Sequence, residues 1–119
     1  MTGKSEIYYK RSTDSGVSWS GRKRLTWNLE WPENPSLAAD SVNGIHLVCN
    51  AGPYFGSAYE IFYRSSADNG TTWAAFKRLT WNSGTSTHPK ITIDSNDDIH
   101  VVWHDFTPGN YEIFYKNRK

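Results

Sequence analysis

The sequence has very little cysteine and no long hydrophobic run. Cys49 is the only cysteine among 119 residues, so an internal disulfide framework is excluded. No stretch approaches the ~20 consecutive apolar residues that a membrane-spanning helix requires, and the mean hydropathy is −0.69. Residues 1–5 contain no apolar core of a secretory signal peptide. We therefore expect neither a disulfide scaffold nor a membrane partner.

An excess of charge of one sign is also absent. The 13 basic and 12 acidic side chains leave a net charge of +1, whereas nucleic-acid-binding domains usually carry a strongly basic surface. This balance predicts that nucleic acid is not a partner. Aromatic side chains, in contrast, make up 15% of the chain. They favour strands, and since no long segment has helical periodicity, we predict an all-β fold.

One eight-residue pattern, S-x-D-x-G-x-x-W, occurs twice, at residues 12–19 and 66–73. Its aspartate can accept hydrogen bonds from backbone N–H groups about two residues further on. Its glycine can adopt a positive φ, and its tryptophan is a large anchor for the loop. Each copy lies between two short strand-like runs, which predicts a hairpin loop. The positions expected to have this structural role are Ser12, Asp14, Gly16, Trp19, Ser66, Asp68, Gly70 and Trp73.

The repeat extends well beyond these loops. Asp14 and Asp68 are 54 positions apart, and the same offset joins further pairs, namely Trp27 with Trp81, Pro35 with Pro89, Asp40 with Asp94 and Ile45 with Ile99. A period near 50 residues is typical of propeller blades of four antiparallel strands. We expect a third and a fourth strand within 6–27, a complete blade at 34–81 and three strands of the next blade at 88–116.

The repeated pattern resembles the Asp-box, or BNR, repeat of sialidase-like β-propellers, in which every fixed position of the pattern is matched here. The resemblance covers nearly the whole chain. It implies a β-propeller fold, a fold-stabilising role for the two Asp boxes, and a secreted or cell-surface location.

Two blades' worth of chain predicts association with further copies. Known propellers use roughly four to eight blades, and two blades would expose broad aromatic faces of a kind that partners normally cover. We expect a homo-oligomeric ring closed head to tail, in which the N-terminal strand of one chain completes the C-terminal blade of the next. Three chains would give the six blades typical of the resembled family. Dimers and tetramers are alternatives, as is an excised segment of a longer propeller.

The resemblance places a ligand site on the face opposite the Asp boxes. Aromatic planes beside carboxylates, amides and imidazoles suit sugar rings, so a glycan is one expected ligand and a protein another. Trp27 and Trp81 recur in both units and can equally pack between blades, whereas Trp31 has no repeat partner. The candidate ligand-binding residues are Trp27, Asn28, Trp31, Trp81, Asn82, His104 and Asp105.

Catalytic signatures are missing. The resemblance would require an arginine triad, a Tyr–Glu nucleophile pair and an aspartic acid/base, yet the family's N-terminal Phe/Tyr-Arg-Ile-Pro signature is absent and Arg24 and Arg78 fall on predicted outer strands. No pair of carboxylates stands out as the two that glycoside hydrolysis needs. We predict a non-catalytic binding or scaffold module without a cofactor. The alternatives are a fragment of a sialidase-like glycoside hydrolase, and a purely structural or engineered propeller fragment without a ligand.

Two patterns weakly resemble metal sites. Residues 94–98, with Asp105 further on, partly match a calcium loop, but Ile99 stands where an EF-hand needs glycine, so a β-turn is the better interpretation. His88 and His104 lack repeat equivalents and could form a local acid–base or metal pair. We predict no metal site.

Overall fold

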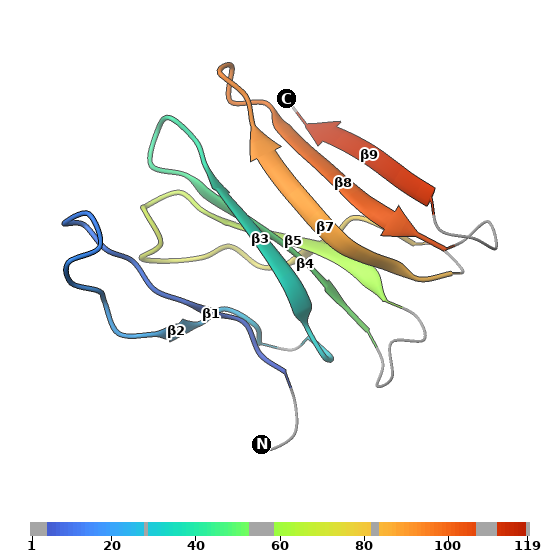
Figure 1. Ribbon diagram of the computed structural model, residues 1–119, viewed down its shortest axis with the longest axis horizontal. Coiled ribbons are helices and arrows are strands. Elements are labelled where there is room, and N and C mark those ends of the chain that lie inside the picture. The colour runs from blue at the N-terminus through green and yellow to red at the C-terminus, as the bar shows by residue number, and fades with distance from the viewer. Residues whose placement is uncertain (1–4, 28, 53–58, 82–83, 107–111, 119) are drawn as a thin grey trace.

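The computed structural model describes residues 5–27, 29–52, 59–81, 84–106 and 112–118. Within these ranges the chain forms nine strands and no helix, so no helix of the described part is long and apolar enough to cross a bilayer. The strands are β1 (Tyr8–Tyr9), β2 (Lys23–Arg24), β3 (Glu33–Ala39), β4 (Ile45–Ala51), β5 (Glu60–Ser66), β6 (Lys77–Arg78), β7 (Ser86–Ile93), β8 (Ile99–Asp105) and β9 (Glu112–Arg118) (Figure 1).

The strands form three antiparallel sheets, none of them closed. The first sheet contains β1 and β2, the second has the order β3-β4-β5-β6, and the third has the order β7-β8-β9. The expectation of an all-β fold built from short antiparallel strands is confirmed. The sheets succeed one another along the chain, and β3 and β7, which begin the second and third sheets, lie side by side (Figure 1).

The long strands β3 and β7 share one irregularity. Each loses its register with the following strand at an X-Pro step, Asn34-Pro35 in β3 and His88-Pro89 in β7. Proline has no N–H to contribute to a ladder, and the preceding Asn34 and His88 adopt positive φ values of 56° and 55°. The repeated proline therefore sets a bulge at the same place in both sheets.

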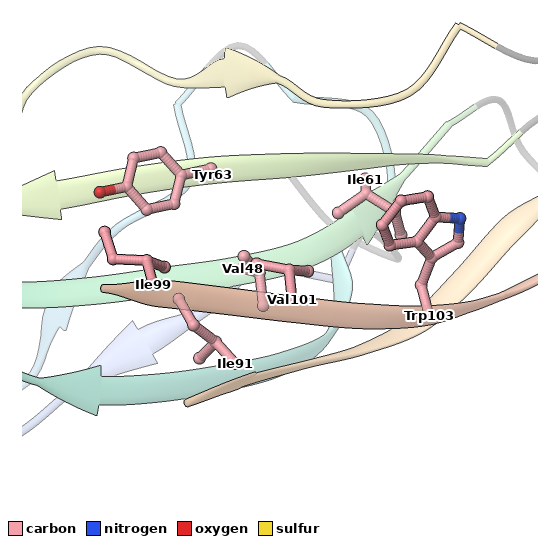
Figure 2. Packing of buried hydrophobic residues seen from close by; sticks show 7 residues of the cluster. All are labelled: Val48, Ile61, Tyr63, Ile91, Ile99, Val101 and Trp103. Carbon is pink, nitrogen blue, oxygen red and sulfur yellow. The ribbon is translucent and has the colours of Figure 1, made fainter. Parts of the chain in front are cut away.

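The second sheet packs against one neighbouring sheet on each face. Side chains alternate between the two faces of a strand, so Val48 of β4 packs toward the third sheet while Cys49 packs toward the first. Burial raises the pKa of the Cys49 thiol to about 12. The core between the second and third sheets comprises Val48, Ile61, Tyr63, Ile91, Ile99, Val101 and Trp103 (Figure 2). The core between the first and second comprises Ile7, Leu29, Cys49 and Ala51, with Phe62 and Phe76 packed against them.

Candidate functional site

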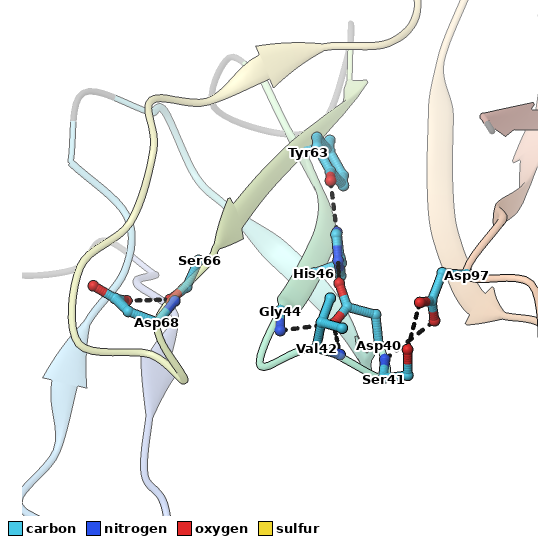
Figure 3. Close-up of polar contacts among 9 residues, drawn as sticks. All are labelled: Asp40, Ser41, Val42, Gly44, His46, Tyr63, Ser66, Asp68 and Asp97. Atoms are coloured by element: carbon cyan, nitrogen blue, oxygen red, sulfur yellow. Dashed lines mark hydrogen bonds and ion pairs between the residues drawn. The ribbon is translucent and has the colours of Figure 1, made fainter.

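Each loop of the repeated S-x-D-x-G-x-x-W pattern, named an Asp-box loop here after the family that the pattern resembles, is held together by its own side chains. In the second loop, the Ser66 hydroxyl donates to Asp68 Oδ1 at 2.7 Å and accepts from the backbone N–H of Gly70 at 2.8 Å. The Asp68 carboxylate also accepts from the backbone N–H and the hydroxyl of Thr72, at 2.9 and 2.6 Å. The backbone donor thus lies four residues after the aspartate. The contact between Ser66 and Asp68 is visible in Figure 3.

The first loop repeats this arrangement. Ser12 donates to Asp14 Oδ1 at 2.8 Å and accepts from Gly16 N at 2.8 Å, and Asp14 accepts from Ser18 N at 2.8 Å. The hydroxyl hydrogen bond from Ser18 is the main cause that lowers the pKa of Asp14 to about 2. The Thr72 hydroxyl does the same for the pKa of Asp68, also to about 2. Both carboxylates are therefore ionised near neutral pH and already engaged within their own loops.

The two loops differ in what surrounds them. Trp73 packs edge-on against Tyr9 of the first sheet, with ring centroids 5.6 Å apart, and its indole N–H donates to Gly70 O at 3.2 Å. Lys23 Nζ donates to the carbonyl oxygen of Thr71 at 2.7 Å, which joins the same loop to β2. The equivalent Trp19 is 58% exposed. Sequence reasoning treated the two loops as equal, because the pattern carries no information about its neighbours.

A second repeated arrangement is a hydrogen-bonded Asp–His–Tyr triad, called the Asp–His–Tyr relay here, at the end of the sheets that carries the Asp boxes. His46 bonds through Nε2 to Asp40 at 2.9 Å and through Nδ1 to the Tyr63 hydroxyl at 2.6 Å. Asp40 also accepts from the backbone N–H groups of Val42 and Gly44 (Figure 3). The hydrogen bond from His46 is the main cause that lowers the pKa of the Asp40 carboxyl.

The third sheet contains the same relay, formed by Asp94, His100 and Tyr115, with contacts of 2.9 and 2.7 Å. Asp94 further accepts from the backbone N–H groups of Asn96 and Asp98. The turn that resembled a calcium loop therefore uses the oxygens of Asp94 internally. Among the described residues, no three or more His, Cys, Asp and Glu side chains are grouped to hold a metal ion. The six-residue spacing from aspartate to histidine, present in both units, was the sequence signal for this relay, and it was missed.

The Asp-box end of the molecule is defined by a direct contact. The backbone N–H of Asn69 donates to Asn43 O at 2.9 Å, which joins the second Asp box to the turn between β3 and β4. That turn is itself joined to the third sheet, because the Ser41 backbone N–H and hydroxyl donate to Asp97 at 3.1 and 2.5 Å (Figure 3). Neighbouring sheets are thus connected by polar contacts at this end.

The opposite end brings together part of the candidate ligand site. The rings of His88 and His104 lie next to each other, with centroids 5.6 Å apart. Below them, the Asn50 side chain is fully buried and its Oδ1 accepts from His88 N at 3.0 Å and from Asn34 Nδ2 at 2.9 Å. Among the described residues, the Asn50 Nδ2 has no hydrogen-bond partner. Trp31 has a positive φ of 48° and is half-buried.

The other candidate residues lie elsewhere or outside the described part. Asp105 is 1% exposed, and it accepts from Ser86 Oγ at 2.9 Å and Trp103 Nε1 at 3.1 Å, so its carboxylate has a structural place in the core. Trp27 and Trp81 are exposed and lie under the guanidinium groups of arginines on the adjoining strands. Asn28 and Asn82 fall outside the described residues.

Hollows of 480 and 350 Å³ lie on opposite sides of the second sheet. The larger, a mostly apolar groove of 480 Å³, lies between the second and third sheets and is lined by Tyr63, Lys77, Arg78, Leu79, Trp81, Ile99, Val101 and Lys116. The smaller, of 350 Å³, lies between the first and second sheets and is lined by Lys23, Arg24, Leu25, Trp27, Arg64, Thr71, Thr72 and Trp73. Trp27, which the sequence predicts on the face opposite the Asp boxes, therefore lines the same hollow as the second Asp-box loop.

No protein-family model matches the chain, and no curated protein matches it.

Proposed function

We propose that this chain is a non-catalytic Asp-box β-propeller module that associates with further copies of itself and presents a ligand-binding surface at the end opposite the Asp boxes. The observation that carries the proposal is a contrast between equivalent faces of the second and third sheets. The same residue types are covered on one sheet and exposed on the other.

The contrast is clearest at two positions. Val48 is completely buried by the third sheet, whereas its equivalent Val102, on the outer face of the third sheet, is 36% exposed. Tyr63 is 9% exposed and its equivalent Tyr115 is 58% exposed. Each sheet thus has a surface suited to receive another sheet, and covering apolar surface is favourable by about 25 cal/mol per Å².

On the opposite face, the exposed residue belongs to the second sheet and its buried equivalent belongs to the third sheet. Leu37 of β3 is 50% exposed, whereas its equivalent Ile91 of β7 is 5% exposed because it packs on the second sheet. The described chain therefore has one uncovered surface of each kind, which is the arrangement that head-to-tail association needs.

The mass of the chain in solution tests self-association. We expect light scattering to give a mass that rises with concentration from one chain of 13.6 kDa to a defined oligomer. A trimer is the favoured result because three copies would supply six blades; a dimer or tetramer would revise only the size of the ring. A single chain at every concentration tested would contradict the proposal.

The absence of catalysis is proposed from the state of the charged side chains. Arg24 is paired with Glu6 at 2.7 Å and Arg78 with Glu60 at 3.3 Å on the outer strands. The two Asp-box carboxylates are engaged within their loops. We expect no turnover of a fluorogenic sialoside by the assembled protein, and measurable hydrolysis would favour the sialidase-like alternative.

The ligand-binding part of the proposal concerns Trp31, His88 and His104. Flat aromatic and imidazole rings can stack on the apolar faces of sugars, and association would multiply one weak site into several. A glycan array probed with the unmodified chain and with Trp31→Ala tests this part. Binding that is lost in Trp31→Ala but retained in Trp27→Ala is expected. An array without hits would remove the carbohydrate version.

A further inference from the structure

We propose that the groove between the second and third sheets receives the first Asp-box loop, residues 12–19, of a second copy of this chain. The inference rests on the self-association proposed above and names the segment that makes the contact. Its basis is an internal example, because the molecule already contains one Asp-box loop docked on a neighbouring sheet.

The groove is the counterpart of the hollow between the first and second sheets. Five of its lining residues have direct repeat equivalents there: Lys77, Arg78, Leu79, Trp81 and Lys116 correspond to Lys23, Arg24, Leu25, Trp27 and Arg64. The remaining lining residues differ. The smaller hollow is bounded by Thr71, Thr72 and Trp73 of the second Asp box, whereas the groove is open onto Tyr63, Ile99 and Val101. The two sites therefore share five equivalent lining residues, and they differ because an Asp-box loop is docked only in the smaller hollow.

The docked loop makes close contacts with the first sheet. Trp73 meets Tyr9 edge-on at 5.6 Å, and Lys23 Nζ donates to the carbonyl oxygens of Gly70 and Thr71 at 3.3 and 2.7 Å. Gly70 lies so near the same ring that an added Cβ would be 2.6 Å from the Tyr9 hydroxyl oxygen. These contacts define what an Asp-box loop requires of its neighbour.

The first Asp-box loop has the same internal structure and an open surface. Trp19 is 58% exposed and Val17 is 84% exposed, and no described atom lies within 4 Å of a Cβ added at Gly16. The molecule thus carries a preformed loop and, on another sheet, a groove of the kind that such a loop fills.

The docked geometry follows from the repeat. Trp19 would meet Tyr63, whose hydroxyl is already fixed by His46, and Lys77 would donate to the carbonyl oxygens of Gly16 and Val17. The groove has a cationic rim of Lys77, Arg78 and Lys116, while the only charged side chain of the loop is the aspartate. The charges are therefore complementary.

Docking also requires that β2 changes its neighbour. In the second sheet the strand after the Asp box pairs with the strand before it, through Phe62 with Arg78 and Tyr63 with Lys77. The third sheet offers β9 at that place, and β9 is held to β8 by seven residue pairs, whereas β1 is held to β2 by two. We therefore expect β2 of the second copy to leave β1 and pair with β9. In both places β2 would meet nearly the same partner sequence, because residues 7–10 around β1 read Ile-Tyr-Tyr-Lys and residues 113–116 of β9 read Ile-Phe-Tyr-Lys.

Two complementary variants test the inference in the intact 119-residue chain. Trp19→Ala removes the anchor of the loop, and Lys77→Glu reverses the charge at the exposed rim of the groove. Loss of a buried tryptophan anchor should raise the dissociation constant roughly tenfold or more, and we expect Lys77→Glu to weaken association as well. An equimolar mixture should form a one-to-one heterodimer, since one intact loop then meets one intact groove.

Two substitutions outside the groove serve as matched controls. Lys90→Glu makes the same charge change on β7, and Val42→Ala removes an exposed apolar group from the turn after β3; both should associate as the unmodified chain does. If the unmodified chain self-associates and both test variants do so equally well, the docking is wrong and the self-association stands. If the unmodified chain does not self-associate, both the docking and the self-association are wrong. Circular dichroism checks that Trp19→Ala folds. If Trp19→Ala does not fold, Lys77→Glu still tests the docking, because Lys77 is exposed.

Discussion

Single residues of this chain show how a repeated sequence can meet two different surroundings. Gly16 and Gly70 both adopt a φ of 90°. Glycine adopts this positive φ easily because it has no Cβ, which explains the glycine in the Asp-box pattern. Gly70 additionally faces the Tyr9 hydroxyl, while Gly16 faces open space. The conformational requirement belongs to the loop, and the steric requirement belongs to the neighbouring sheet.

Replacement of each glycine by alanine separates these two requirements. Gly16→Ala should lower the free energy of unfolding by roughly 1–2 kcal/mol, the cost of a left-handed conformation for a residue with a Cβ. Gly70→Ala should cost more, since its Cβ would also displace the Tyr9 ring. Chemical denaturation of both variants measures the difference. Equal losses would mean that the Tyr9 ring moves aside for the added methyl group without a cost in stability.

A buried threonine links neighbouring strands within the second sheet. Thr80 is 4% exposed, and its hydroxyl accepts from Ile61 N at 2.9 Å and donates to Glu60 Oε1 at 2.5 Å. Thr80→Val keeps the shape but leaves the buried N–H unsatisfied, which should lower the free energy of unfolding by roughly 1–3 kcal/mol. Thr80→Ser is the control, because it retains the hydroxyl and should cost about 0.8 kcal/mol for the lost methyl. A larger loss in the serine variant would contradict the role of the hydrogen bonds.

At the scale of elements, the sequence predicted the strands well and their extents less well. Alternating apolar residues and the repeated offset predicted the long strands β3 to β5 and β7 to β9, because each is backed by a buried face. The sequence predicts a third and a fourth strand within 6–27, on either side of the first Asp box, yet β1 and β2 have two residues each. The same two segments still bond to each other outside these short strands, since Leu25 N donates to Ile7 O at 2.9 Å and Ile7 N donates to the Thr26 hydroxyl at 3.0 Å.

The candidate site was less accessible to sequence reasoning. The Asp-box residues were found from their pattern because their bonds are local, within four positions of one another. The burial of Asp105 and the position of His88 beside His104 depend on the register of β7 with β8 within the third sheet, and the unequal exposure of Trp19 and Trp73 depends on which sheets are neighbours. A pattern of residue types does not encode that information.

The Asp-box loops also predict how stability depends on pH. The folded-state pKa of Asp14 and of Asp68 is about 2, below the ordinary value of 3.8. A carboxyl group with a depressed pKa contributes stability that is fully present above about pH 4 and is lost as the pH falls through about 2. Thermal unfolding should therefore shift to lower temperature across this acidic window and stay level above it.

The variant with Asp14→Asn and Asp68→Asn isolates this effect. It should be less stable than the unmodified chain at pH 6, and its stability should fall less steeply between pH 4 and pH 2. The remaining slope would come from groups such as Asp40 and Asp94, whose pKa values are lowered mainly by their histidine partners. An unchanged slope would show that the Asp-box carboxylates do not control the acid transition.

For the whole molecule, the arrangement of the sheets decides which surfaces are complete. The second sheet contacts a neighbouring sheet on each face, although Leu37 of β3 remains 50% exposed, and the third sheet has one covered and one exposed face. The same substitution at equivalent positions of the two sheets should therefore affect a different property in each sheet. It should disrupt folding where the face is internal, and it should disrupt association where the face is external.

Val48 and Val102 provide that comparison. Val48→Glu would bury a carboxylate without a partner in the core between the second and third sheets, which costs several kcal/mol and should prevent folding. Val102→Glu places the same charge on a side chain that is 36% exposed, so the stability of the single chain should change by no more than about 0.5 kcal/mol. Its association should nevertheless weaken, because the charge would lie within the surface proposed to receive another copy. Light scattering together with circular dichroism distinguishes the cases, and a folded Val102→Glu chain that assembles normally would exclude this face from the contact.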